Sequence, residues 1–196
     1  MARQLARQNM AAFAAGQFDA VVTNAAGCGS TLKEYDRLFA PDEPEHAAAM
    51  AFVSKMRDVT EFLASLGLTS ALNPMNVRVT YQDSCHLLHG QKVREAPRKL
   101  LQSIPGLDLV ELPYADICCG SAGVYNVTQT EASLELLTTK MKFAHGTGAT
   151  IIATANPGCL LQLRAGAEIH NTGQEVVHVV ELLDRAQNAP AIARNK

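Results

Sequence analysis

Ile117-Cys118-Cys119-Gly120-Ser121-Ala122-Gly123 is the most unusual stretch of this chain, because it places two adjacent cysteines directly before glycines. Packing explains this pattern poorly, since the whole sequence contains only five cysteines. Consecutive Cα atoms lie about 3.8 Å apart, which is closer than the usual disulfide range, so Cys118 and Cys119 are poor disulfide partners for each other. Their thiols can instead both face a centre that is larger than one ion.

Three further cysteines lie far from this stretch in the sequence. Cys85 precedes Cys118 with 32 residues between them, Cys159 follows Cys119 with 39 residues between them, and Cys28 lies near the amino end. The first two of these form a set with the adjacent pair. The rest of the chain is interpreted as a scaffold that brings three cysteine-bearing segments together.

The composition is that of an ordinary globular protein: 196 residues, 47% hydrophobic and 18% charged, are enough for a substantial core. The formal net charge of −2, without a basic stripe, argues against nucleic acid as a partner. No apolar run approaches the roughly 20 residues that cross a bilayer, so we expect no transmembrane segment. Without an export signal we expect a cytoplasmic location, where reduced thiols favour metal or redox chemistry over disulfides.

Helical and strand-like patterns alternate along the chain. Helices are expected at about residues 2–15, 46–66, 86–103, 130–145 and 181–186, and short strands at residues 18–23, 77–81, 109–112, 150–155 and 176–180. This alternation predicts an α/β fold, with a parallel β-sheet covered by helices on both faces. Such sheets bind ligands beyond the carboxyl ends of their strands, and the cysteines are expected in loops at those ends.

Two segments of the chain resemble each other. Val21–Cys28 and Ile152–Cys159 both run from a buried strand through a polar turn to Gly-Cys, 131 residues apart. A duplication with this period would place the counterparts of the other cysteines before residue 1. The expected organisation is a carboxyl-terminal remnant of a first domain at residues 1–45, a complete second domain at residues 46–187 and a frayed tail at residues 188–196.

The cysteine set admits more than one chemistry. Four thiolates can hold an iron–sulfur cluster, and Gly120, Gly123 and Gly158 let backbone N–H groups approach it closely. Structural zinc is the other metal to consider, although its ligands normally come in Cys-x2–4-Cys pairs, which the sequence lacks. Inert buried thiols, or a nucleophilic Cys85 beside His86, are the metal-free alternatives.

The pattern Cys-x32-Cys-Cys-Gly-x38-Cys resembles the CCG cysteine-rich domain of heterodisulfide reductases, lactate-utilisation proteins and the glycolate oxidase iron–sulfur subunit. The sequence around the cysteines is most similar to the last of these. The likeness covers residues 2 to about 187 and is carried by four segments: Val22–Tyr35, Tyr81–Leu87, Ile117–Asn126 and Ala155–Cys159.

The resemblance implies an electron-transfer subunit that passes electrons from a flavoprotein (FAD) oxidising glycolate, or a similar 2-hydroxy acid, toward the respiratory chain. It allows a peripheral association with the inner face of the cell membrane through the complex. The cluster ligands that it implies are Cys85, Cys118, Cys119 and Cys159, in an iron–sulfur cluster of the 4Fe–4S type. No catalytic residue is expected, and the chain is not expected to turn over substrate alone.

The sequence departs from the family pattern in two ways. No Cys-x2-Cys-x2-Cys-x3-Cys run is present, so the chain resembles only the carboxyl-terminal half and is expected to be a fragment, a truncated gene or one piece of a split subunit. The family pattern ends in Cys-x-x-Cys, but Asn156 and Gln162 stand three residues before and after Cys159. Four thiolates therefore remain, and Cys28 is assigned to an incomplete second site.

Two questions stay open at this level. His86 could hydrogen-bond a cluster sulfur without binding iron itself, or it could be solvated or cap its helix. The alternatives to the electron-transfer role are a cluster-free or zinc-bearing domain that docks on the flavoprotein, and a redox subunit for lactate utilisation or heterodisulfide-like reduction.

Overall fold

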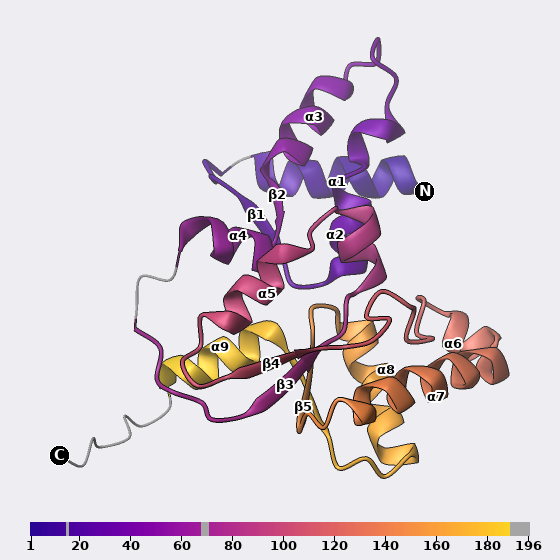
Figure 1. Cartoon of the computed structure of the whole chain (residues 1–196). Coiled ribbons are helices and arrows are strands. Elements are labelled where there is room, and N and C mark those ends of the chain that lie inside the picture. The colour runs from indigo at the N-terminus through magenta and orange to yellow at the C-terminus, as the bar shows by residue number, and fades with distance from the viewer. Residues whose placement is uncertain (15, 68–70, 189–196) are drawn as a thin grey trace.

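The computed structural model describes residues 1–14, 16–67 and 71–188 (Figure 1). The expected frayed tail therefore lies almost wholly outside the described residues. The elements are α1 (Ala2–Ala14), β1 (Val21–Thr23), α2 (Ala26–Leu32), η1 (Tyr35–Leu38), α3 (His46–Lys55), β2 (Met56–Asp58), α4 (Val59–Leu66), β3 (Arg78–Tyr81), η2 (His86–Gly90), α5 (Glu95–Gln102), β4 (Asp108–Glu111), α6 (Tyr125–Thr128), α7 (Thr130–Gly146), β5 (Ile151–Thr154), α8 (Pro157–Ile169), β6 (Glu175–His178) and α9 (Val179–Asn188).

The larger sheet confirms the α/β prediction. Its four strands run in the order β4-β3-β5-β6, and all three pairings are parallel. Successive residues of a strand point to opposite faces, so Ile151 and Ala153 pack in one core with α5 and α9, while Ile152 packs in another with α7 and α8. Figure 1 shows these two pairs of helices on either side of the sheet. The carboxyl ends of all four strands consequently lie at one edge.

A smaller sheet lies in the amino-terminal part of the chain. Strand β1 pairs in parallel with β2, and α1, η1 and α3 enclose a separate core around Met10, Phe52 and Met56. The described residues 1–58 are called the two-strand unit below, and residues 59–188 the four-strand unit. By packing, residues 46–58 therefore lie with the amino-terminal elements.

The expected helix at residues 46–66 is wrong in its middle, where three residues form β2. Its apolar residues do recur at helical spacing, but Met56 is fully buried beside Val21 in the parallel pair. Asp58 then begins α4 as its N-cap, in a capping box with Glu61. Pairing with a strand far away in the sequence has overridden the local helical pattern.

The expected helix at residues 86–103 also divides. A π-helical turn at His86–Gly90 is followed by Lys92, whose φ of 61° lies in the left-handed region, and α5 begins only at Glu95. A residue with positive φ cannot continue a right-handed helix. None of the described helices is both long and apolar enough to cross a membrane.

Candidate metal centre

All five cysteines line one cavity of about 420 Å³ at the carboxyl edge of the four-stranded sheet. Cys85 follows β3 at the start of the π-helical turn, and Cys118 and Cys119 lie in the loop after β4. Cys159 and Cys28 occupy the third positions of α8 and α2, so these two lie in helical first turns rather than in loops. The placement of cysteines at strand ends is otherwise as expected, and no disulfide joins them.

Four of the thiols lie close enough around this cavity to shift one another's pKa. The interacting neighbours are Cys85 with Cys118, Cys118 with Cys119, and Cys119 with Cys159. Cys119 and Cys159 are only 1% and 5% exposed, whereas Cys85 and Cys118 are half-buried at the solvent side. The site therefore has a closed inner end and an accessible outer end.

The sulfur contacts divide the thiols into donors and acceptors. The pKa of Cys118 is lowered to about 2, because Cys119 and Cys85 donate to its sulfur and the Gly120 N–H lies 3.4 Å from it. Donation to Cys118 raises the pKa of both donors, and burial adds to this. The pKa of Cys159 is lowered, first through its bond from Cys119. These interactions thus stabilise the anionic form of the Cys118 and Cys159 sulfurs.

Lys140 supplies the positive charge beside these sulfurs. Its side chain is 1% exposed, and its ammonium donates to the carbonyl oxygens of Tyr114 at 2.7 Å and Ala115 at 3.2 Å. Burial lowers its pKa, while the nearby Cys119, Asp116, Cys118 and Asp83 favour its charged form. Among the residues that the structure describes, no carboxylate forms an ion pair with it. A buried ammonium bonded only to neutral carbonyls fits an anionic centre at the cysteines.

The loop after Cys119 has a backbone that needs glycine. Gly120 has a φ of +92°, and a Cβ added there would overlap the carbonyl oxygen of Ser133. The Ser133 hydroxyl donates to the Gly120 carbonyl at 2.8 Å, which pins the loop to α7. Gly123, with a φ of +68°, and Gly158 both line the cavity, and a Cβ at Gly158 would press on Ser121 Oγ at 3.0 Å.

A buried ion pair supports the turn that carries Cys85. Asp83 is 3% exposed and accepts two hydrogen bonds of 2.8 Å from the Arg98 guanidinium of α5. Arg98 also donates to Glu111 at the end of β4 at 2.9 Å, and it lies 5.1 Å above the Tyr81 ring. The carboxylates raise the pKa of Arg98, so the guanidinium stays charged. This network ties together the ends of the two strands that deliver Cys85 and the adjacent pair.

Two histidines that follow or end strands at this edge of the sheet, His86 and His178, have different surroundings. His86 is exposed, lines the cavity, and places its Nδ1 3.4 Å from the Cys85 sulfur. His178 is 5% exposed; its Nδ1 accepts from the Val180 N–H, and its Nε2 lies 3.2 Å from the Asn24 carbonyl. His178 is thus a core histidine with both nitrogens engaged.

The cysteine thiols of the cavity have the ligand chemistry of an iron–sulfur cluster. Soft thiolates are the ligands that such clusters prefer, and the cavity beside them exceeds the size of one ion. In the described ranges, no three or more His, Cys, Asp or Glu side chains converge as a site for a single metal ion. The four cysteines line the cavity together without forming a site for one ion.

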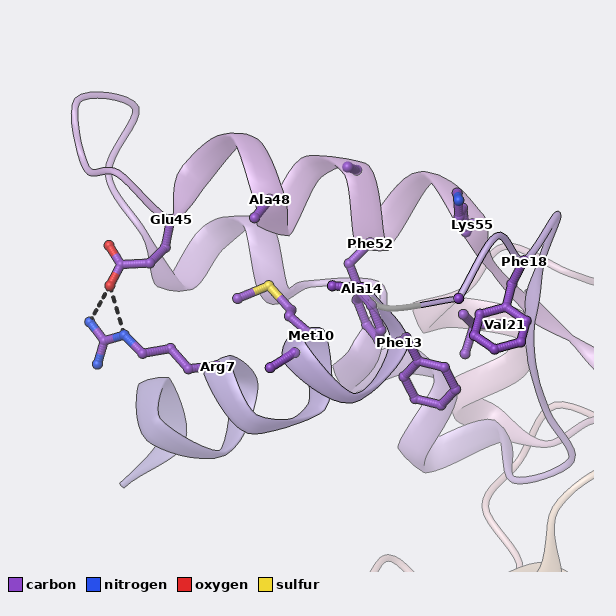
Figure 2. Close-up of a pocket in the computed structure, with 13 residues that line it drawn as sticks. Arg7, Met10, Phe13, Ala14, Phe18, Val21, Glu45, Ala48, Phe52 and Lys55 are labelled. Carbon is purple, nitrogen blue, oxygen red and sulfur yellow. Dashed lines mark hydrogen bonds and ion pairs between the residues drawn. The ribbon is translucent and has the colours of Figure 1, made fainter.

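A second cavity of about 460 Å³ lies between α1 and α3 in the two-strand unit (Figure 2). The rings of Phe13 and Phe52 line it, and the Arg7–Glu45 ion pair of 2.7 Å stands at one end. Its described lining is mostly apolar and includes no thiol. We therefore place the candidate redox chemistry in the cysteine cavity.

The sequence analysis does not identify Lys140 and Asn156 as residues that interact with the cysteines. Lys140 falls in register with Leu137, Met141 and Ala144 on the buried face of α7, so its position in an apolar stripe is a usable signal. In the sequence, Asn156 stands out only as a missing cysteine. Its amide donates to Cys159 Sγ at 3.5 Å, a contact that no spacing in the sequence indicates.

Comparison with known proteins agrees with this description. The sequence model of the family CCG, described as "Cysteine-rich domain", matches residues 1–33 and 79–164. The chain is 46% identical over 186 residues to the "Probable glycolate oxidase iron-sulfur subunit" of Bacillus subtilis; the match covers 92% of this chain and 42% of that protein. It therefore spans less than half the length of this relative.

Two further relatives carry other names. "Lactate utilization protein A" of Oceanobacillus iheyensis is 33% identical over 186 residues, covering 93% of this chain and 75% of that protein. A subunit of the fumarate reductase (CoM/CoB) of Methanothermobacter marburgensis is 36% identical over 170 residues, covering 86% of this chain and 32% of that protein. The similarity is thus spread over proteins with different named activities.

Proposed function

The chain belongs to the family of CCG cysteine-rich domains, and on that premise we propose that it is an iron–sulfur electron-transfer module of a 2-hydroxy-acid oxidase, with glycolate as the substrate of the complex. The observation that carries the proposal is the placement of Cys85, Cys118, Cys119 and Cys159 around one cavity at the carboxyl edge of the sheet. Relatives that are named as iron–sulfur and reductase subunits support it.

The proposed ligands are Cys85, Cys118, Cys119 and Cys159. A bound cluster supplies one-electron transfer, and four thiolates suit the 4Fe–4S type. The residues of this chain would hold the cluster and would exclude water from its inner end, where Cys119 and Cys159 are buried. The half-buried Cys85 and Cys118 mark the end at which electrons would enter and leave.

Two groups of the chain would offset the negative charge of the bound centre. The Gly120 N–H already lies within reach of a sulfur, and the Lys140 ammonium is buried close by. Both favour the reduced state, which carries one more negative charge. His86 Nδ1 would add a hydrogen bond to the Cys85 sulfur at the outer end.

The partners are proposed from the family. We expect a flavoprotein (FAD) subunit to oxidise the hydroxy acid and to pass single electrons to this module, with the complex in the cytoplasm at the inner face of the membrane. We further propose that residues 1–45 correspond to the end of a first CCG domain and residues 46–187 to a second. The two separate matches of the family model, at residues 1–33 and 79–164, support this division.

A lactate-utilisation complex is the second candidate. The chain covers 75% of "Lactate utilization protein A" but only 42% of the glycolate oxidase subunit, although identity is higher to the latter, 46% against 33%. In both candidates the four cysteines would bind the cluster, and the flavoprotein would determine which hydroxy acid is oxidised. Electron transfer to the reconstituted chain from a glycolate-oxidising or a lactate-oxidising flavoprotein separates the two.

A redox titration tests the electron-transfer role. Protein reconstituted anaerobically with iron and sulfide should show an EPR signal on reduction with dithionite, and the signal should disappear on mild reoxidation and return on a second reduction. A Cys118→Ser/Cys119→Ser double variant should lack the signal. Iron and sulfide near zero, or a double variant that keeps partner binding and full thermal stability, would favour a docking domain that is cluster-free or holds zinc.

A further inference from the structure

Cys28 lies on the wall of the same cavity as the other four cysteines, although it comes from the two-strand unit. Its side chain is exposed, so it makes no contribution to a packed core. The cavity wall around it consists of Ala25 and Gly27, which belong to the turn after β1 and to the first turn of α2. The cavity is therefore closed by residues from both units.

One side chain connects Cys28 to the proposed cluster ligands. Asn156 accepts a hydrogen bond of 3.3 Å from the Gly27 N–H with its Oδ1, and donates to Cys159 Sγ at 3.5 Å with its Nδ2. The residue before Cys28 and the thiol of Cys159 thus share a single amide. This places the two Gly-Cys turns against each other across the mouth of the cavity.

Two more hydrogen bonds fix the position of α2 on the four-strand unit. Gln91 donates from Nε2 to the Ala26 carbonyl at 2.9 Å, and the His178 Nε2 lies 3.2 Å from the Asn24 carbonyl. A Cβ at Gly29 would stand 2.6 Å from the Gln91 amide nitrogen, so the approach is close. The segment that carries Cys28 is therefore held by three side chains of the four-strand unit, Asn156, Gln91 and His178, in addition to its contacts with β1 and β2.

We propose that Cys28 is a fifth thiol ligand of the metal centre held by Cys85, Cys118, Cys119 and Cys159, so that the centre bridges the two units. The inference rests on the proposed function, because it requires that an iron–sulfur centre binds in this cavity. Coordination would release one proton from the Cys28 thiol to solvent and form one iron–sulfur bond at an iron that already holds a cysteine; the coordination number of that iron would rise by one, no existing bond would break, and no oxidant or reductant is needed. It replaces the assignment of Cys28 to a separate, incomplete site.

Alkylation of the thiols tests this contact directly. The metal-free and the anaerobically reconstituted protein are treated with N-ethylmaleimide, and modification of each cysteine is followed by mass spectrometry. An exposed thiol reacts readily, whereas a thiolate bound to metal does not. Cys28 should react quickly in the metal-free protein and at least about tenfold more slowly once the centre is bound.

Two variants control the experiment. Ser54→Cys places a reference thiol on the exposed surface of α3, and this thiol should react at the same rate with and without iron. Asn156→Ala removes the amide that joins the two turns. In this variant Cys28 should lose part of its protection while Cys118 and Cys119 remain protected.

The EPR spectrum provides a second reading. A Cys28→Ser variant should retain most of its iron, since four thiolates suffice for a cluster, but its reduced-state signal should differ from that of the parent. If iron binds and Cys28 reacts as fast as the reference thiol, with an unchanged signal in Cys28→Ser, the inference fails and the proposed function stands. If iron and sulfide do not bind to the parent chain, both fail together.

Discussion

The two Gly-Cys turns of the molecule have similar sequences and different surroundings. Cys159 follows β5 in the middle of the four-stranded sheet, is 5% exposed, and contacts Asn156 and Cys119. Cys28 follows β1 in the two-stranded sheet and is exposed. A strand followed by a polar turn and Gly-Cys therefore places a thiol at the carboxyl end of that strand. Whether other thiols lie directly beside it depends on which residues follow the neighbouring strands.

The two units also differ in the partners that they give to a buried carboxylate at a strand end. Asp83, beyond β3, is neutralised by the bidentate Arg98. Asp58, at the end of β2, is fully buried and accepts from Thr60 at 2.8 Å, while its second oxygen has no partner among the described side chains. The four-strand unit is thus built around paired charges, and the two-strand unit leaves one charge only partly compensated.

Substitution of the two kinds of cysteine should give the largest difference. Cys119→Ser removes a thiol that contacts two others, so its iron content after reconstitution should fall at least roughly tenfold. Cys28→Ser leaves all four connected thiols in place and should keep most of the iron. Iron and sulfide analysis of both variants checks this, and equal losses would mean that the connected thiols are not the main ligands.

Removal of the Asp83 partner should be the next largest effect. Arg98→Met leaves a buried carboxylate without its cation, which costs about 3–5 kcal/mol in the free energy of unfolding. Arg185→Met breaks the exposed pair with Glu175 and should cost no more than about 1 kcal/mol. Denaturant unfolding of the metal-free variants measures both, and similar losses would show that burial of the first pair is not what matters.

Neutralisation of the buried lysine should change the redox potential. Lys140→Gln keeps a donor for the Tyr114 carbonyl but removes the positive charge near Cys118 and Cys119. The reduced centre is then stabilised less, and its midpoint potential should fall by on the order of tens of millivolts. Lys142→Gln, on the exposed side of the same helix, is the matched control. A potential unchanged in both, at full iron content, would contradict the role of Lys140.

The smallest effect concerns Asp58. Burial raises its pKa above the unfolded value, so the folded state holds the proton more tightly, and stability is lost as the pH rises through the folded pKa. Asp58→Asn keeps an N-cap and cannot ionise. The variant should therefore gain stability relative to the parent as the pH rises from about 4 to about 7. A difference that shrinks over this range would mean that the charge is compensated.

Much of the four-strand unit could be predicted from the sequence, because its strands and helices show clear patterns within short segments. Apolar strands that alternate with helices indicate the parallel sheet, and the cysteines lie at the strand ends as expected. Helix α7 of this unit, and also α1 of the two-strand unit, begin and end within about two residues of their predicted bounds, since both show a continuous helical pattern.

The sequence-based predictions failed where contacts between residues far apart in the sequence determine the structure. Met56–Asp58 has helical spacing, yet it pairs with Val21–Thr23 as a strand. Lys140 has the polarity of a surface residue, yet its ammonium reaches two carbonyls of another loop. The position of Cys28 depends on the docking of α2 against the four-strand unit, which no pattern within either segment encodes.

The central claim is that the four connected thiols hold an iron–sulfur centre. Its most direct test is metal and sulfide analysis of the parent chain after anaerobic reconstitution with iron, sulfide and zinc all offered. The account predicts about four irons and about four sulfides per chain, without stoichiometric zinc. One zinc per chain with no sulfide, or no bound metal at all, would contradict it.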